Sequence, residues 1–227
     1  MTKIYRIIIF LTLINLPFST YAHIQHYEDL KRIEFDIYRN NKLIGTHIFS
    51  FKKLDGQLAV KSEINFKIKK FGIVFYTYHV EGTEIYEDGK LIKFNSKTNQ
   101  NGKEKYVNMI LENEEYTIDG SSYQGKVPED YLLGTWWNHS IVKAEAQISA
   151  VSGRIIKQKV TFLSKEIIKL GEKSYNTLHF NFSSTDKKLT KNKKLNTNVW
   201  YDEQTLNWVK ASFEKKGKWE YKLVSIN

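Results

Sequence analysis

Alternating apolar and polar residues, separated by turn-forming pairs, run through most of this chain. Ile33, Phe35 and Ile37 alternate with polar neighbours, and similar segments recur to the end of the sequence. Successive side chains of a β-strand point to opposite faces of the sheet, so this period of two predicts half-buried strands. The pairs Asp88-Gly89 and Asn101-Gly102 are typical of two-residue hairpin turns, in which both positions need a positive φ. The pattern predicts about thirteen strands, joined mainly as antiparallel hairpins.

One segment, Pro128 to Lys143, interrupts this pattern. Pro128 followed by Glu129 and Asp130 suits the first turn of a short helix, where a missing N–H and negative charges are both favourable. No long amphipathic helix is indicated elsewhere. We therefore expect an all-β fold with one short helical segment near residues 128–140. Because a sheet of this size twists until it curls, we expect the antiparallel sheet to form a barrel or half-barrel.

The first 22 residues are typical of a secretory signal peptide. Lys3 and Arg6 precede the apolar run Ile7–Leu16, Pro17 breaks that run, and Ala22 ends a small-residue cleavage site. The run is short for a bilayer span, although an N-terminal membrane anchor is the alternative. Cleavage near Ala22 would leave a single all-β domain, residues 23–227, in the periplasm.

The chain contains no cysteine. This excludes a thiol nucleophile, a cysteine-ligated zinc and a lipid-anchored lipoprotein, and it leaves a hydrophobic core to hold an exported domain together. The net charge is +10, and removal of Lys3 and Arg6 with the signal peptide leaves +8. A basic surface favours anionic partners. The expected compartment argues against nucleic acid and favours lipid headgroups.

Aromatic residues are the strongest candidates for ligand binding. Tyr76 and Tyr78 share one face of a predicted strand, where they either bind an amphipathic ligand or pack as core. Trp136, Trp137 and Asn138 combine two stacking surfaces with an amide. The alternative is that this segment plugs one end of the barrel and its rings are core.

Charged residues suggest two weaker possibilities. The segment 183–195 is either a solvated loop or a docking patch for an anionic membrane surface, since it holds Lys187, Lys188, Lys191, Lys193 and Lys194. His23, as a new N-terminus, would resemble a copper-binding terminus, but no second ligand has diagnostic spacing, so we expect neither a metal nor another cofactor.

Several segments in this order resemble a family of exported bacterial β-rich proteins of unknown function. They are Ile44–Phe49, Phe75–Tyr78, Glu84–Tyr86, Ser96–Gly102, Trp137-Asn138 and Val199–Asp202, and the resemblance spans residues 32–224. It implies a β-rich periplasmic domain and no established activity. The polar members of the family's motifs that match here are His47, Glu84, Asn99, Asn101, Asn138 and Asp202.

The leading functional hypothesis is a periplasmic, non-enzymatic binding or carrier protein for an amphipathic ligand, such as a lipid or glycolipid. The sequence contains no nucleophile elbow, zinc-protease helix or phosphate-binding glycine loop. The candidate ligand-binding residues are Tyr76, Tyr78, Trp136, Trp137, Asn138, His47, Glu84, Tyr201 and Asp202. One alternative is an enzyme acting on envelope glycan, which requires Glu84, His139 or Asp202 to converge in one cleft. Another is an outer-membrane-associated β-barrel, which the alternation in Phe66–Lys69 permits.

Overall fold

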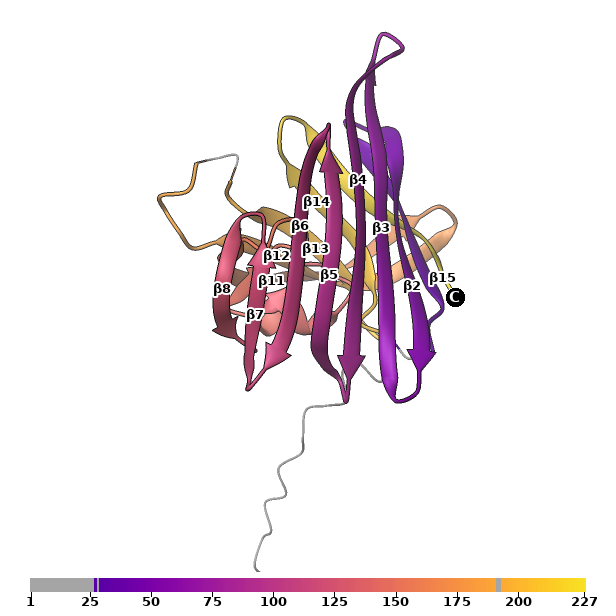
Figure 1. Cartoon of the computed structure of the whole chain (residues 1–227). Coiled ribbons are helices and arrows are strands. Elements are labelled where there is room, and N and C mark those ends of the chain that lie inside the picture. The colour runs from indigo at the N-terminus through magenta and orange to yellow at the C-terminus, as the bar shows by residue number, and fades with distance from the viewer. Residues whose placement is uncertain (1–26, 28, 191–192) are drawn as a thin grey trace, which may run out of the picture.

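The computed structural model describes residues 27, 29–190 and 193–227, which form 15 strands in one sheet and one short 3-10 helix (Figure 1). The predicted signal peptide, residues 1–22, and His23 lie outside the described residues. The strands are β1 Arg32–Arg39, β2 Lys42–Leu54, β3 Gln57–Lys70, β4 Ile73–Glu87, β5 Lys90–Gln100, β6 Lys103–Glu112, β7 Glu115–Gly120, β8 Tyr123–Pro128, β9 Leu132–Leu133, β10 Ala146–Ile148, β11 Ile155–Leu170, β12 Lys173–Ser184, β13 Asn196–Asp202, β14 Trp208–Glu214 and β15 Lys218–Ile226.

The strand order is that of two meanders joined at the middle of the sheet. Strands β8 to β1 lie side by side in descending order. Strand β1 then pairs with β15, and strands β15 to β9 follow, again in descending order. All described pairs are antiparallel except β9 with β10. The predicted all-β, mainly antiparallel fold is confirmed.

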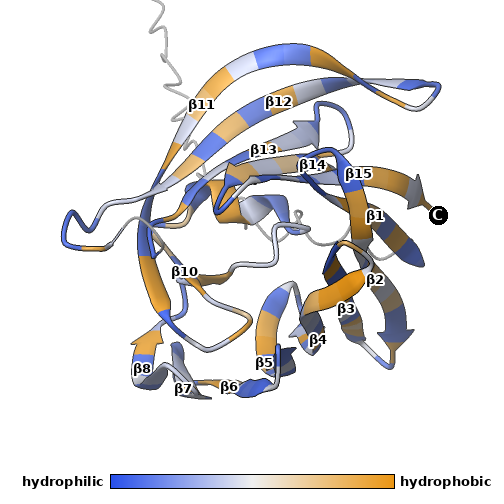
Figure 2. Cartoon of the chain, turned by 90° about the horizontal axis from the view of Figure 1, so that it is seen from above, coloured by the Kyte–Doolittle hydropathy of each residue, from blue (hydrophilic) through white to orange (hydrophobic). Residues whose placement is uncertain are grey.

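The sheet curls until its two edge strands approach each other. Only residues 129–131 connect the edge strands β8 and β9, and a link of that length spans at most about 15 Å. Further contact comes from the Ser122 backbone N–H, which donates to the Ser152 carbonyl at 2.8 Å. A Cβ on Gly120 would lie 2.9 Å from that carbonyl oxygen, so glycine permits this approach. Seen from above, β5–β8 and β11–β15 lie on opposite sides of the interior (Figure 2).

The hairpin turns follow the residues that predicted them. Asp88 and Gly89 have φ of 47° and 78°, and Asn101 and Gly102 have φ of 52° and 82°. Asparagine, aspartate and glycine tolerate this left-handed region better than other residues. These turns, with those of β1–β2, β3–β4 and β14–β15, fix which strand ends lie together. We call the end with the β1–β2, β3–β4, β5–β6 and β14–β15 turns the upper end, as in Figure 1.

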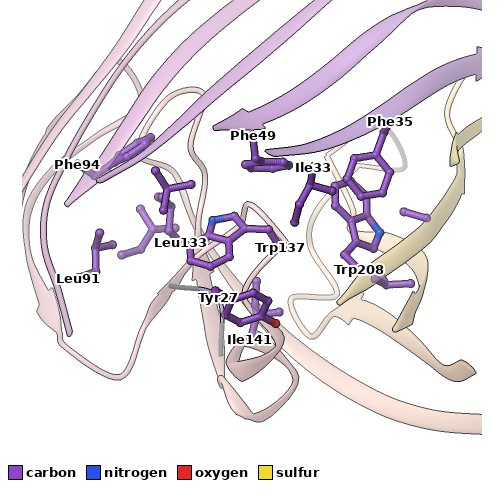
Figure 3. Packing of buried hydrophobic residues seen from close by; sticks show 14 of the residues in the cluster. Tyr27, Ile33, Phe35, Phe49, Leu91, Phe94, Leu133, Trp137, Ile141 and Trp208 are labelled. Atoms are coloured by element: carbon purple, nitrogen blue, oxygen red, sulfur yellow. The ribbon is translucent and has the colours of Figure 1, made fainter. Parts of the chain in front are cut away.

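Large apolar side chains fill the lower and middle interior. Trp137, Phe49, Phe35 and Trp208 are all fully buried and come from both halves of the sheet and from the segment between β9 and β10 (Figure 3). The rings of Phe35 and Trp208 lie 3.9 Å apart between centroids. Burial of such side chains contributes roughly 1.5–3 kcal/mol each relative to exposure, so this cluster holds the two halves together.

The predicted helical segment is a 3-10 helix, His139–Lys143, at the C-terminal end of the expected region. Its N-cap is Asn138, whose side chain accepts a 3.0 Å hydrogen bond from the Ser140 N–H. Pro128 does not begin this helix, because it is the last residue of β8 and pairs with Glu115. An edge strand tolerates a proline that has no N–H to donate. Within the described part of the chain, no helix has the length and apolar character needed to cross a membrane.

Candidate functional site

A buried carboxyl group lies near the centre of the interior. Glu84 is on the inner face of β4 and is fully buried. Tyr86 O–H donates to its Oε2 at 2.5 Å, and Trp137 Nε1–H donates to its Oε1 at 3.0 Å. Thr135 contributes a further side-chain hydrogen bond, while Asn138 bonds to Tyr86. We call these five residues the Glu84 cluster.

Burial raises the pKa of Glu84 to about 7, although its hydrogen bonds to Tyr86, Trp137 and Thr135 act in the opposite direction. A carboxylate taken out of water loses its hydration, and three donors replace part of it. The hydrogen-bond partners of the Glu84 carboxyl group are packed side chains. Their hydrogen bonds therefore connect β4 to the segment that contains Trp137. The fully buried Trp137 also packs edge-on against Tyr27, with ring centroids 5.1 Å apart.

Trp136 adopts an unusual backbone conformation next to this cluster. Its φ is 61°, in the left-handed region that a bulky residue rarely enters. The buried Tyr201 O–H donates to the Trp136 carbonyl at 3.0 Å. This conformation sends the Trp136 side chain to the upper interior, where its ring is 5.7 Å from Trp208 and 6.4 Å from Tyr221.

Aromatic side chains continue from Trp136 to the upper end of the sheet. Phe66 stacks on Tyr78 at 4.8 Å and on Tyr76 at 6.1 Å, and the edge of Trp219 lies 5.3 Å away. Trp136, Tyr76, Tyr78 and Trp219 are half-buried rather than fully enclosed. We call the following set the upper aromatic cluster: His47, Phe66, Tyr76, Tyr78, Trp136, Trp208, Trp219 and Tyr221.

Several polar atoms of this cluster lack partners. His47 Nδ1, Trp136 Nε1 and Trp208 Nε1 are buried and make no hydrogen bond within the described residues. His47 Nε2 lies 3.1 Å from Ser62 Oγ, and the His47 ring is 5.8 Å from Trp208. Burial lowers the pKa of His47 to about 3, so its ring is neutral at physiological pH. Buried polar groups are nearly always hydrogen-bonded in proteins, so three in one cluster are exceptional.

Positive charges surround the upper end of the cluster. Lys105 Nζ donates to Gln100 Oε1 at 2.5 Å, and Gln100 Nε2 donates to the Tyr76 hydroxyl at 2.7 Å. Burial lowers the pKa of Lys215, and the charges of Arg154, Lys105 and Lys216 lower it further. Lys105 comes from β6, whereas Arg154 and Lys215 belong to the other half of the sheet. No described carboxylate forms an ion pair with Lys105, Arg154 or Lys215, and we call these three residues the positive rim.

The structure distributes the predicted site residues over three places. His47, Tyr76, Tyr78 and Trp136 belong to the upper aromatic cluster. Glu84, Trp137 and Asn138 belong to the Glu84 cluster, and Tyr201 joins the two through its bond to Trp136.

Asp202 lies apart from both clusters. Its Oδ1 accepts hydrogen bonds from the N–H groups of Gln204 and Thr205 and from the Thr205 hydroxyl, at 2.8–3.1 Å. An aspartate that caps its own turn in this way has a local structural role. Asp202 and Glu84 therefore sit in separate hydrogen-bond networks, which gives no support to a shared catalytic cleft.

Sequence reasoning missed Trp208, Trp219, Tyr221 and Phe66 as members of the cluster. Trp219 and Tyr221 are two residues apart on β15 and therefore share a face of the sheet. Their approach to Tyr78 and His47 depends on how the sheet curls, which no local pattern encodes. Tyr86 could have been found, because it lies two residues after Glu84 and hence on the same face.

Comparisons with known proteins agree with this fold. The model of a family described as a domain of unknown function, DUF6134, matches residues 35–224. The crystal structure of the beta-barrel-like protein of the domain of unknown function DUF1849 from Brucella abortus is similar, with a TM-score of 0.59 and 11% sequence identity. That match covers 87% of this chain and 97% of the other. No curated protein matches. Among the described residues, no group of three or more histidine, cysteine, aspartate or glutamate side chains is arranged to hold a metal ion.

Proposed function

The chain belongs to the DUF6134 family, and we propose that it is a periplasmic, non-enzymatic binding or carrier protein for an amphipathic ligand, such as a lipid or glycolipid. The ligand's apolar part contacts the upper aromatic cluster, and a terminal anionic group faces the positive rim. The predicted signal peptide supports the periplasmic location in this proposal.

The observation that carries the proposal is the group of unpartnered polar atoms within an aromatic surface. Ligand sites in proteins are mostly apolar, with a few polar atoms that fix orientation. The polar atoms here are Trp136 Nε1, Trp208 Nε1 and His47 Nδ1. The apolar contacts come from the rings of Phe66, Tyr78 and Trp219. An N–H without a partner gains a hydrogen bond when a ligand oxygen arrives, whereas a paired one gains nothing.

The positive rim supports an anionic group on the ligand. Burial is the main cause of the lowered pKa of Lys215, and the neighbouring charges of Arg154, Lys105 and Lys216 lower it further, so these cations repel one another. An anion that binds between Lys105, Arg154 and Lys215 relieves this repulsion. A fatty acid or an acidic lipid has both the apolar chain and the charge that these two surfaces require.

Two matched tryptophan variants test the polar contacts. Trp136→Phe keeps an aromatic ring and removes an N–H that has no partner, so we expect unchanged stability and roughly threefold to tenfold weaker binding of a fluorescent fatty acid. Trp200→Phe is the control, because the Trp200 ring stacks on His179, outside the upper aromatic cluster, and its Nε1–H donates to Glu166. That variant loses stability and keeps its ligand affinity. Equal affinity of Trp136→Phe and the wild type would contradict the proposed site.

The rim is tested with a charged and an uncharged probe. Lys105→Gln/Lys215→Gln weakens binding of the fluorescent fatty acid but not of its methyl ester, because only the acid carries a charge. Lys159→Gln, a change on the exposed face of β11, leaves both affinities unchanged. If the double variant binds both probes like the wild type, the anionic group is not recognised at this rim.

A further inference from the structure

The β3–β4 hairpin extends beyond every other turn at the upper end of the sheet (Figure 1). Its tip is apolar and open to solvent: Phe71 is 90% exposed, Ile73 65%, Val74 45% and Phe75 58%. Ile73, Val74 and Phe75 are consecutive, so apolar side chains occupy both faces of the hairpin. The rest of the described fold therefore leaves most of this tip uncovered.

The turn residue at this tip differs from those at the first position of the β4–β5 and β5–β6 hairpins, which are aspartate and asparagine. Phe71 and Gly72 have φ of 50° and 79°, the same left-handed pair found at Asp88-Gly89 and Asn101-Gly102. Asparagine, aspartate or glycine normally occupies the first position, since a bulky residue is strained there. Phe71 brings this strain without any compensating burial. The unfavourable backbone conformation of Phe71 is not offset by packing of its side chain. This combination indicates a functional role for the Phe71 side chain.

Lysines lie directly behind the apolar tip. Lys67, Lys69 and Lys70 are exposed on β3, and no acidic residue occurs between Glu63 and Glu81. Lys70 Nζ lies 5.4 Å from the centroid of the Phe71 ring. The neighbouring turns at this end add further exposed positive side chains, Lys42 beside Leu43 and Lys216 and Lys218 in the β14–β15 hairpin.

We propose that the β3–β4 hairpin is a membrane-docking element that inserts Phe71, Ile73, Val74 and Phe75 into the surface of an anionic phospholipid bilayer. A bilayer accepts apolar side chains from both faces of a hairpin, whereas a protein groove or an added strand would leave one face exposed. The lysines complement the negative surface potential of such a membrane.

The spacing of the two kinds of side chain matches the layers of a bilayer surface. Strands rise about 3.3 Å per residue, so Lys69 and Lys67 lie roughly 7 and 13 Å behind Phe71. Interfacial segments bury their apolar residues about 5–10 Å into the boundary between headgroups and acyl chains. With Phe71 at that depth, Lys69 and Lys70 reach the level of the phosphates.

Phe71→Asn is the decisive variant, because asparagine suits the turn and removes the apolar tip. We expect it to fold with an unchanged or raised melting temperature. The assay is cosedimentation of the chain without residues 1–22, which lie outside the described fold, with vesicles of phosphatidylcholine containing one third phosphatidylglycerol. Because the variant no longer buries one phenylalanine side chain in the bilayer, we expect its partitioning onto the vesicles to be at least about tenfold weaker.

Matched variants separate this hairpin from other exposed apolar and basic segments. Ile167→Asn removes an apolar side chain that is 72% exposed on β11, and it leaves partitioning unchanged. Lys69→Glu/Lys70→Glu weakens partitioning more than about fivefold per lysine, whereas Lys187→Glu/Lys188→Glu, in the loop after β12, does not. When phosphatidylglycerol is omitted from the vesicles, the two double lysine variants no longer differ in their partitioning.

A tryptophan at the tip measures insertion directly. Phe71→Trp gains fluorescence quenching by lipids brominated in their acyl chains, compared with the wild type. The proposal is overturned if Phe71→Asn partitions like the wild type, or if only Lys187→Glu/Lys188→Glu weakens partitioning. It is also overturned if Phe71 instead drives self-association without vesicle binding. This inference is independent of the proposed ligand: Phe71→Asn keeps its affinity for the fluorescent fatty acid, and Trp136→Phe keeps its vesicle partitioning.

Discussion

Trp137 Nε1 donates a 3.0 Å hydrogen bond to Oε1 of Glu84, and both residues are fully buried. The bond joins a strand of the first meander to the segment between β9 and β10 of the second meander. It places a titratable group where protonation affects the stability of the whole domain.

The pH dependence of Glu84 has a definite sign. Its pKa is raised from 4.5 to about 7 in the folded protein, so between those values the folded state holds a proton that the unfolded state has lost. The free energy of unfolding therefore falls as pH rises through this window, by roughly 3 kcal/mol. Glu84→Gln removes the fall, because glutamine stays neutral. Urea unfolding at about pH 4.5 and about pH 8 measures the difference. The same fall in both proteins would refute this assignment.

His47 has the opposite effect. Burial lowers its pKa from 6.5 to about 3, so the unfolded chain takes up a proton first as the solution is acidified. Its contribution to stability is complete above about pH 6.5 and is lost as pH falls towards about 3. His47→Phe/Ser62→Ala removes this loss and leaves no hydroxyl unpaired. We expect a flatter acid limb in urea titrations, with Ser62→Ala alone retaining the wild-type slope.

Tyr201→Phe tests the support of Trp136. The variant loses the 3.0 Å hydrogen bond to the Trp136 carbonyl, which costs about 1 kcal/mol of stability. Without this hydrogen bond, the backbone of Trp136 is no longer held in its left-handed conformation. We therefore expect lower affinity for the fluorescent fatty acid. Tyr175→Phe is the control, since Tyr175 makes no described hydrogen bond through its hydroxyl and lies outside the cluster. Calorimetry and ligand titration distinguish the two variants.

Asp202→Ala tests whether Asp202 stabilises its turn or binds the ligand. The variant loses three hydrogen bonds to Gln204 and Thr205, so we expect a loss of about 1 kcal/mol in stability. Affinity for the fluorescent fatty acid stays the same, because Asp202 belongs to neither cluster. Weaker ligand binding with unchanged stability would assign Asp202 to the site instead.

Local patterns predicted the strands and most turns, because the period of two and turns such as Asp88-Gly89 act over a few residues. The same period placed Tyr76 with Tyr78, which both stack on Phe66. Pro128 was misjudged, since its fixed φ suits an edge strand as well as a first helical turn.

Contacts between the two halves of the sheet were beyond prediction. The bond between Glu84 and Trp137 depends on the path of the chain from β8 to β10 across the interior. The packing of Trp208 against Phe35 depends on the pairing of β1 with β15, which joins the two ends of the described fold. Register over such separations is set by tertiary packing, and a single sequence carries no local signal for it.

Native mass spectrometry of the protein purified from its native cells is the most direct test of ligand binding by this fold. We expect a mass above that of the polypeptide, owing to an amphipathic molecule that organic solvent releases and that Trp136→Phe retains less well. Detection of the bare polypeptide mass, together with no binding of a fluorescent fatty acid to the wild type, would contradict the account.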